Sequence, residues 1–422
     1  MQETSPADAR AFVMKLARGL HAHGYPAHRL ESALVAVSQQ LGLEAQFFSA
    51  PTSLIASFGT GDDERTFQAR VAPGDVDLGR LAEYDAVAQE VARGELPPAA
   101  AAARLDAIAE EPPRYSPTAR LLAFGAASAA AARFFGGGTA EIAASGLMGL
   151  AIGLAEAGLG RSAAGRQVFQ PLAAAIAAFL AALVGRFTGA VSGSILTLAG
   201  LIVLVPGFPF TVALIELATQ HLVSGTVRLA GAAMAFLGLG FGVAVGEALG
   251  ARAFGPPLPH GAVQAPAPWT MALAVVVAAL GFTVLLRAER RDAPWIVASG
   301  LVAFSGARLG AALLGPELGA FLGALVAGLY GNVYNRAVRR PAMVALVPGI
   351  LLLVPGSLGF ASVSSLIGDE TLVGIQTAFR MTLVAVSLAT GVVASNALVP
   401  PRLLHAARPS GPAPREDRRE LL

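Results

Sequence analysis

Apolar residues recur at helical spacing through most of the N-terminal part of the chain. They fall every three or four positions over 7–23 and 26–41, which predicts two amphipathic helices, and two more helices are expected near 77–93 and 97–110. Between the two pairs, aromatic and β-branched residues are interrupted by a Gly-rich turn, a pattern typical of short strands. Residues 1–118 are therefore predicted to form a small α+β domain.

After this domain, polar positions become rare, and apolar segments long enough to cross a bilayer follow one another. The predicted fold class is an all-α polytopic membrane protein with ten transmembrane helices, in two five-helix repeats over 119–250 and 268–400. A Pro-rich linker over 251–267 separates the repeats, and the polar tail 401–422 is expected to be disordered. The predicted spans are 119–135, 138–158, 168–186, 190–207, 226–250, 268–287, 294–314, 317–335, 341–360 and 372–399.

The composition supports a membrane protein. Hydrophobic residues make up 55% of the chain and charged residues 14%, whereas soluble domains carry roughly 25% charged residues. A net charge of +2 gives no reason to expect nucleic-acid binding. Cysteine is absent, the six histidines lack paired spacing and there is no P-loop, so no metal site, cofactor or ATP hydrolysis is predicted.

Arginine residues gather in alternate loops, which predicts the orientation of the helices. The N-terminal sequence lacks a basic region followed by an apolar one, so we expect no cleaved signal peptide and a cytoplasmic first domain. An even number of spans then leaves both termini in the cytoplasm, and the Arg- and Ala-rich composition favours a bacterial inner membrane. The loops expected on the cytoplasmic side carry Arg114, Arg120, Arg161, Arg166, Arg287, Arg290, Arg291, Arg336, Arg339 and Arg340.

Two short motifs recur in the same order in both halves of the membrane part. The stretch AFLAALV at 178–184 returns as AFLGALV at 320–326, and LVPGF at 204–208 returns as LVPGS at 353–357. An odd number of spans per repeat would insert the second copy upside down, and inverted repeats are typical of secondary transporters. The alternative is that Ala- and Leu-rich helices match one another by chance.

The first Pro-Gly pair is expected to break a membrane helix. Pro206 cannot continue the backbone hydrogen bonds, and Gly207 adds little packing. The free N–H groups after the break, around Phe208 to Thr211, suit a carboxylate. Pro209 and the Thr211 hydroxyl complete this candidate substrate site. Glu216 is the candidate to balance an ammonium group or to carry a proton.

The second half repeats these features. Pro355, Gly356 and Ser357 form the matching candidate binding segment. Glu216 is joined as candidates for coupling and charge by His221, Arg228, Asp369 and Arg380. Several plainer interpretations stay open. A Pro-Gly pair often only ends a helix, the acids and His221 suit wet loops, and both arginines suit interfaces where long side chains reach water.

At these motifs the chain resembles the threonine/serine exporter family, with its two modules fused. HGYPAHRLESALVAVSQQLGL at 23–43 is similar to the cytoplasmic opening of that family, with its R-L-E signature at Arg29, Leu30 and Glu31. LVPGFPFTVALIELATQHLVSGTVRLAGA is similar to the Pro-Gly motif of the first module. VPGILLLVPGSLGFASVSSLIGD, with GIQTAFRMTLVAVSLATG, is similar to the end of the second.

The resemblance implies export of threonine and serine driven by an ion or proton gradient. Its pattern differs here at Val212, where an Asn is expected, at Glu216, where an Asp is expected, and at His221, where an acid is usual. These differences bear on the substrate range. The residues that the resemblance carries over are Pro206, Gly207, Pro209, Thr211, Glu216, Gly225, Arg228, Pro355, Gly356, Gly368, Asp369 and Gly374.

We therefore predict a secondary transporter, not an enzyme, that exports small hydroxy amino acids by alternating access, with a proton as the coupling ion. Its expected partners are threonine or serine, the proton and the lipid bilayer, and a homo-oligomer stays open. Three alternatives remain: a passive channel, a membrane scaffold for the soluble domain, and an exporter of dicarboxylates or dipeptides through the same fold.

Overall fold

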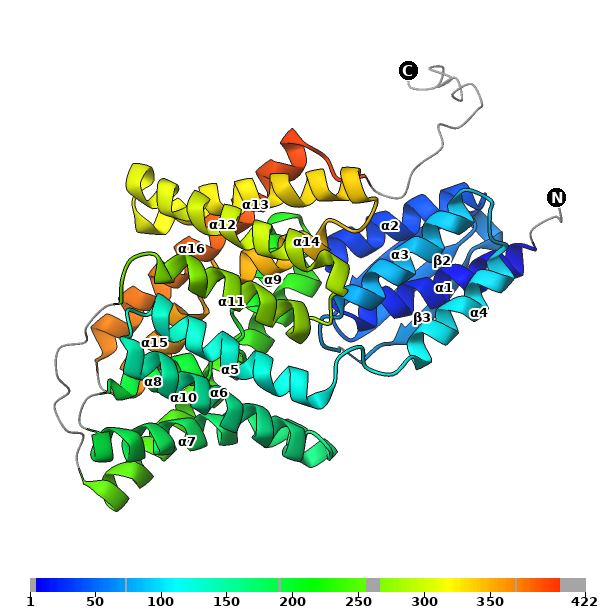
Figure 1. The fold of residues 1–422 in the computed structure, drawn as a ribbon. Helices are drawn as coiled ribbons and strands as arrows, with labels where there is room; N and C mark the ends of the chain where they lie inside the picture. Colours follow the sequence, from blue (N-terminus) through cyan, green and yellow to red (C-terminus); the bar gives the residue numbers. More distant parts are fainter. Residues whose placement is uncertain (1–4, 73, 189–190, 256–265, 369, 403–422) are drawn as a thin grey trace.

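The computed structural model describes residues 5–72, 74–188, 191–255, 266–368 and 370–402. Asp369, most of the Pro-rich linker and nearly all of the polar tail lie outside these residues, so the predictions made for them have no structural counterpart here. In the described part, an N-terminal α+β domain (blue to cyan in Figure 1) packs against one end of a larger helical part.

The N-terminal domain has the elements expected from the pattern. Its strands form an antiparallel sheet in the order β1-β2-β3, with Ala45 opposite Phe58 and Ser53 opposite Arg70. The side chain of Ser5 caps the first helix and that of Asp77 the third, which explains where both begin. The elements are α1 (Pro6–Ala22), α2 (Ala27–Gln40), β1 (Ala45–Ala50), β2 (Ser53–Phe58), β3 (Arg65–Arg70), α3 (Leu78–Ala92) and α4 (Pro98–Glu110).

The helical part repeats one order of elements: three long helices, two short ones, and a final long helix. The first set is α5 (Pro117–Phe134), α6 (Thr139–Leu159), α7 (Ala163–Thr188), α8 (Gly193–Gly200), α9 (Gly207–Ala218) and α10 (Leu222–Phe254). The second set is α11 (Thr270–Leu285), α12 (Ala293–Leu314), α13 (Pro316–Val338), α14 (Met343–Leu351), α15 (Gly356–Ile367) and α16 (Thr371–Leu398).

Many of these helices carry large apolar side chains on their outer surfaces. Phe241, Met234 and Leu147 are each more than 60% exposed, and water solvates such surfaces poorly. Within the described residues, six helical stretches are long and apolar enough to cross a membrane, and α9 and α11 are shorter apolar helices. The chain is thus a mostly helical membrane protein, while the count of ten spans and the inverted arrangement stay predictions.

Two of the three Pro-Gly pairs of the helical part interrupt the helical path, whereas the third, Pro348-Gly349, lies inside α14. Pro206 precedes α9 and Pro355 precedes α15, with nearly the same backbone angles, φ −80° and ψ 38° in the first and φ −80° and ψ 34° in the second. The span expected at 190–207 is therefore helical only over α8, which ends at Gly200, and a separate helix, α9, begins at Gly207.

Glycines bring the long helices into close contact. On α10, a methyl group added at Gly242 or Gly246 would overlap the backbone carbonyl of Pro171 or Ala175 on α7. On α16, a methyl group added at Gly391 would lie 2.5 Å from the carbonyl oxygen of Phe321 on α13. In each half, the final long helix is thus held against the third by contacts that only glycine permits.

Candidate functional site

The two breaks meet inside the helical part. A methyl group added at Gly207 would lie 2.8 Å from the Cα of Gly356, and one added at Gly356 would lie 3.3 Å from the Cα of Gly207. The flanking valines follow the same reciprocal pattern, since Val354 crowds Gly207 and Val205 crowds Gly356. Any larger residue at either glycine would push the two helix starts apart.

Backbone N–H groups of two helix starts consequently lie near one another. In α9 the first backbone bond of the helical type is donated by Phe210 to Pro206, and in α15 by Gly359 to Pro355, both at 3.1 Å. Before these, α9 offers only the Phe208 N–H, because Pro209 has none and the Gly207 N–H donates to Val205 at 2.8 Å. In α15 the N–H groups of the first three residues have no intrahelical acceptor. Helix N-termini carry partial positive charge, which suits an anion.

Thr211 and Ser357 differ in burial at the place where α9 and α15 meet, which we call the crossing. The Thr211 hydroxyl is fully buried and donates to the Gly207 carbonyl oxygen at 3.1 Å, so it also supports the helix start. Ser357 is half-buried in the first turn of α15. Phe208 is also half-buried, whereas Pro209 is exposed. The predicted binding residues of the two halves are therefore close together at the breaks.

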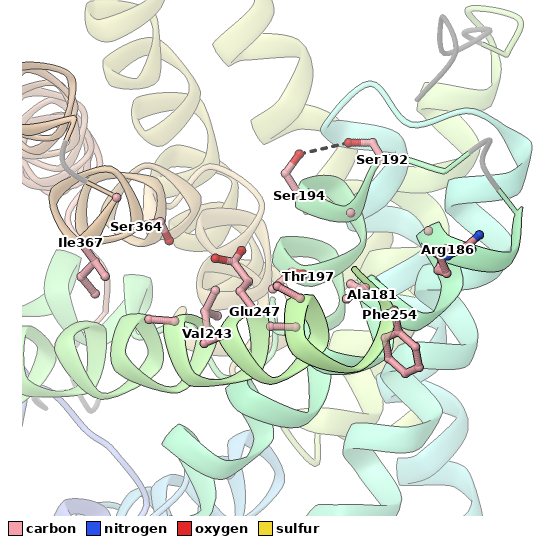
Figure 2. Close-up of a pocket in the computed structure, with 18 of the residues that line it drawn as sticks. Ala181, Arg186, Ser192, Ser194, Thr197, Val243, Glu247, Phe254, Ser364 and Ile367 are labelled. Carbon is pink, nitrogen blue, oxygen red and sulfur yellow. Dashed lines mark hydrogen bonds between the residues drawn. The ribbon is translucent and has the colours of Figure 1, made fainter. Parts of the chain in front are cut away.

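A cleft of about 680 Å³ opens at the end of the helical part away from the N-terminal domain. Figure 2 shows its walls, which come from α7, α8 and α10 of the first half and from α15 of the second. Its polar lining is made of the side chains of Arg186, Ser192, Ser194, Thr197, Glu247 and Ser364. The sequence alone does not identify Glu247 as a site residue, because a single acid near the end of a helix does not reveal which way its side chain points.

Glu216 lies at the opposite end, beneath the N-terminal domain. Its carboxylate is fully buried and accepts a hydrogen bond from the backbone N–H of Ala27, the first residue of α2, at 3.0 Å. Arg228 donates to the same carboxylate from Nε at 3.0 Å and from Nη2 at 3.2 Å. The hydroxyl of Ser224 adds a fourth bond at 3.0 Å. Glu216 thus joins α9, α10 and α2.

His221 belongs to the same contact. We call the contact of Glu216, Ser224, Arg228 and His221 with α2 the α2 dock. Its Nε2 lies 3.3 Å from the Glu31 carboxylate, whose other oxygen accepts the Ser49 N–H at 2.7 Å. The His28 ring stacks edge-on near that of His221, with centroids 6.1 Å apart. Burial, then the nearby Arg29, lowers the pKa of His28 to about 3, so that ring is neutral. Burial raises the pKa of Glu31, against the opposing effects of Ser49 and His221.

Arg29 extends the α2 dock to the last helix. It is buried and donates to the side-chain oxygen of Asn396 on α16 at 3.5 Å. Beneath it, a cavity of only about 40 Å³ separates the start of α2 from Phe208 and Thr211 of α9. The R-L-E stretch therefore has a physical explanation: its charged ends bind the helical part, while Leu30 is fully buried in the domain core.

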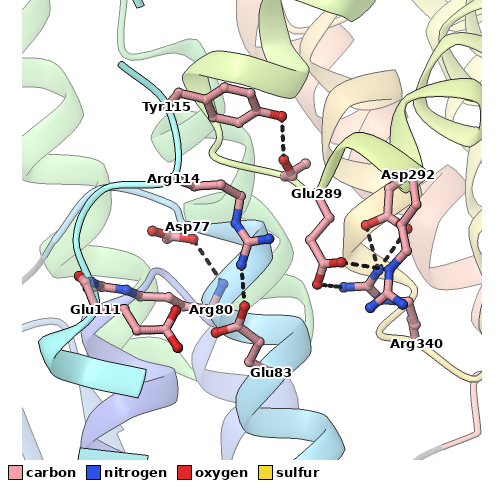
Figure 3. Close-up of polar contacts among 11 residues, drawn as sticks. Asp77, Arg80, Glu83, Glu111, Arg114, Tyr115, Glu289, Asp292 and Arg340 are labelled. Atoms are coloured by element: carbon pink, nitrogen blue, oxygen red, sulfur yellow. Dashed lines mark hydrogen bonds and ion pairs between the residues drawn. The ribbon is translucent and has the colours of Figure 1, made fainter. Parts of the chain in front are cut away.

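A second polar contact joins the N-terminal domain to the region around α11 and α12. The Leu78 N–H donates to the Leu286 carbonyl at 2.9 Å, and the Tyr115 hydroxyl donates to the Ala288 carbonyl at 2.8 Å. Beside it, Figure 3 shows Arg340 held by Glu289 at 2.5 Å and by Asp292 at 2.9 Å. The domain is thus attached at two places.

The structure separates the predicted coupling residues into groups. Glu216, His221 and Arg228 come together in the α2 dock rather than with the Pro-Gly pairs. Arg380 is well exposed and pairs with Glu317 on α13 at 3.3 Å, and Asp369 lies outside the described residues. Among the residues described, no group of three His, Asp or Glu side chains could hold a metal ion.

Several apolar helices of membrane length, two of them interrupted where they meet, define the class as a polytopic membrane protein. Comparison with known families gives the particular group. A threonine/serine exporter model matches residues 11–250, and a second model, described as "Threonine/Serine exporter, ThrE", matches residues 271–398. The chain belongs to the threonine/serine exporter family.

Several curated relatives are yeast proteins. The pheromone-regulated membrane protein 10 of Candida albicans is 31% identical over 245 residues, which cover 56% of this chain and 22% of that protein. Its namesake from Saccharomyces cerevisiae is 31% identical over 247 residues, covering 56% and 31%. An uncharacterized protein of Schizosaccharomyces pombe is 28% identical over 245 residues, covering 56% and 32%. The chain spans less than a third of these relatives, and no solved structure matches it.

Proposed function

We propose that the protein is a secondary transporter that exports small hydroxy amino acids such as threonine and serine across a membrane. The observation that carries this proposal is the reciprocal contact of Gly207 and Gly356, which brings two broken helices together inside the bundle. Substrate sites of secondary transporters lie at such breaks, where half-helix N-termini point at anionic groups. The first-turn amides of α9 and α15 would hold the carboxylate of the amino acid, with Thr211 and Ser357 beside them.

The two halves would be inverted repeats of five membrane passes each. In support, α9 leaves the crossing toward the α2 dock and ends there near Glu216, whereas α15 ends at the far cleft with Ser364. The two half-helices thus leave the crossing in opposite directions, as an inverted duplication requires. The clustered arginines near the N-terminal domain favour a cytoplasmic location for it and for both termini, in a bacterial inner membrane.

The proposed cycle is alternating access driven by protons. The cleft of about 680 Å³ at one end and the cavity of about 40 Å³ under α2 correspond to a state open on the far side and closed at the dock. Loading from the cytoplasm then requires α2 to leave α9. Glu216 would couple this step to a proton, since its protonated form loses the ion pair with Arg228 and weakens the hold on Ala27.

Proteoliposomes loaded with labelled threonine test the proposal. Efflux is measured with and without an imposed proton gradient for wild type, Gly207→Ala and Gly231→Ala. Gly231 is the matched control, because a methyl group there meets open space, whereas at Gly207 it overlaps Val354. We expect gradient-dependent efflux that falls at least tenfold in Gly207→Ala and is unchanged in the control. Equal efflux in all three proteins would refute the crossing as the site.

Two further results would change the class or the substrate. Threonine flux that ignores the gradient would point to a passive channel. No threonine flux, with flux of a dicarboxylate or a dipeptide, would remove hydroxy amino acids as the substrate. Gel filtration and thermal unfolding of each variant separate loss of folding from loss of transport.

A further inference from the structure

Glu247 is a carboxylate on the apolar helix α10 that has no partner among the described residues. No hydrogen bond or ion pair from any described residue reaches it, and it stands on the cleft-facing side of α10 with Gly240 and Val243. Figure 2 shows its side chain pointing from α10 into the space beside α8 and α15. The large apolar residues Phe241 and Val245 are exposed on other sides of the same helix.

Glu247 is exposed to the cleft, and no described residue neutralises its charge. An ionisable side chain within a membrane-spanning helix is by default a candidate for binding a substrate or an ion. Arg186 also lines the cleft but forms no ion pair with Glu247 among the described residues. The other acid nearby, Glu141, is already engaged, because its carboxylate accepts the backbone N–H groups of Gly138 and Ser192 at 3.0 and 3.1 Å. Glu247 is thus the acid free to receive a positively charged ligand in this cleft.

The remaining lining suits the other parts of an amino acid. The α8 helix begins in the cleft after Ser192, and its first backbone bond of the helical type is donated by Leu196 to Ser192, so the amides of Gly193 and Ser194 have no intrahelical acceptor. Ser364 has a buried hydroxyl that lacks a hydrogen-bond partner among the described residues. Thr197 adds a second hydroxyl on the wall formed by α8.

We propose that this cleft is a second ligand site, in which Glu247 binds a monovalent cation, namely the ammonium group of the exported amino acid. The first turn of α8 receives its carboxylate, and the hydroxyls of Thr197 and Ser364 face its side chain. This inference rests on the proposed function and deepens it, since it gives the substrate a binding site on the release side. The volume falls within the roughly 300–1,000 Å³ typical of small-molecule sites.

Glu216 is a poorer candidate for this role. Its carboxylate already accepts four hydrogen bonds from Ala27, Ser224 and Arg228, and it is fully buried. The cavity near it holds only about 40 Å³. A ligand ammonium would have to displace the arginine and α2 together, whereas at Glu247 it displaces no side chain.

Carbodiimide labelling of the full chain in proteoliposomes tests the site without relying on transport. Dicyclohexylcarbodiimide reacts with carboxyl groups in apolar surroundings, and mass spectrometry locates the adduct. We expect labelling at Glu247 that vanishes in Glu247→Gln and slows at least fivefold when threonine is added outside. An equal concentration of 3-hydroxybutyrate, which has the same hydroxyl and carboxylate but no ammonium group, should give no protection. The internal control is labelling at Glu156 on α6, whose carboxylate pairs with Arg120 on α5.

Each outcome has a distinct meaning. Protection by potassium or sodium chloride but not by threonine would keep the cation site and overturn its amino-acid ligand. Labelling of Glu247 at the same rate under every condition would overturn the site itself. Protection by threonine in a wild-type protein that shows no threonine efflux would leave this inference standing and refute the proposed function.

Discussion

The α2 dock gives a quantitative prediction for Glu216→Gln. The substitution keeps the shape of the side chain and one oxygen that can accept from Ala27, but it removes the charge that Arg228 faces at 3.0 Å. The carboxylate is fully buried, while the arginine side chain is 26% exposed. The free-energy cost of the substitution therefore falls between that of losing a surface ion pair and that of breaking a buried one, at about 2–3 kcal/mol. At about 1.4 kcal/mol per decade, opening of the dock becomes roughly 30 to 150 times more populated.

Hydrogen exchange measured by mass spectrometry reads this population directly. We expect exchange of the amides at 27–30 to accelerate by that factor, while amides in the middle of α6 keep wild-type rates. Glu95→Gln is the matched control, because Glu95 pairs with Arg93 on the surface and is 55% exposed. Acceleration of less than threefold at 27–30, or equal acceleration in α6, would refute the view that Glu216 specifically holds the domain in place.

Two further predictions concern stability. Burial raises the pKa of Asp85 from 3.8 to about 6. The charged carboxylate therefore lowers the free energy of unfolding by up to roughly 3 kcal/mol above pH 7, whereas below about pH 4 the group is protonated and this cost disappears. We expect Asp85→Asn to raise the Tm at pH 8 and to leave it nearly unchanged at pH 4. Arg340→Met should cost about 3–5 kcal/mol in thermal unfolding because it leaves Asp292 buried and uncompensated. The control Arg291→Met removes a 70% exposed side chain and should cost less than about 1 kcal/mol. Equal losses in the two arginine variants would contradict this assignment of the buried charge.

The sequence predicts local features of this fold well. Proline and glycine disfavour a continuous helix, so the breaks at Pro206 and Pro355 could be predicted as candidates. Residue chemistry alone does not settle them, because Pro171 and Pro348 lie inside α7 and α14. Apolar spacing likewise predicts the helices of the N-terminal domain, because a buried stripe needs that period. The extent of α9 is not fixed in this way, since no local signal shows that the chain continues as a helix for twelve residues beyond the proline.

Long-range contacts could not be predicted from the sequence. Glu216 binds the backbone of a residue 189 positions away, and nothing in its neighbourhood indicates that partner. Its spacing from the Pro-Gly pair suggested a place beside the substrate, whereas α9 carries it about two and a half turns away from Gly207 and into the α2 dock. Glu247 illustrates the opposite case, since its importance depends on a cleft that four separate helices create.

The glycine contacts between the final and third helices of each half have a consequence for motion. Because Gly242 and Gly246 press α10 onto the backbone of α7, neither helix can slide or roll against the other without a steric clash. The same holds for α16 on α13 through Gly391. Each pair is thus tightly packed within its own half. The two halves also meet where Ala232 and Phe236 of α10 pack with Met381 and Ala385 of α16, and where Gly207 of α9 touches Gly356 of α15. A methyl group added at Gly207 would separate α9 from α15, and because the helices of each half are packed so closely, the neighbouring contacts between the halves would shift with it.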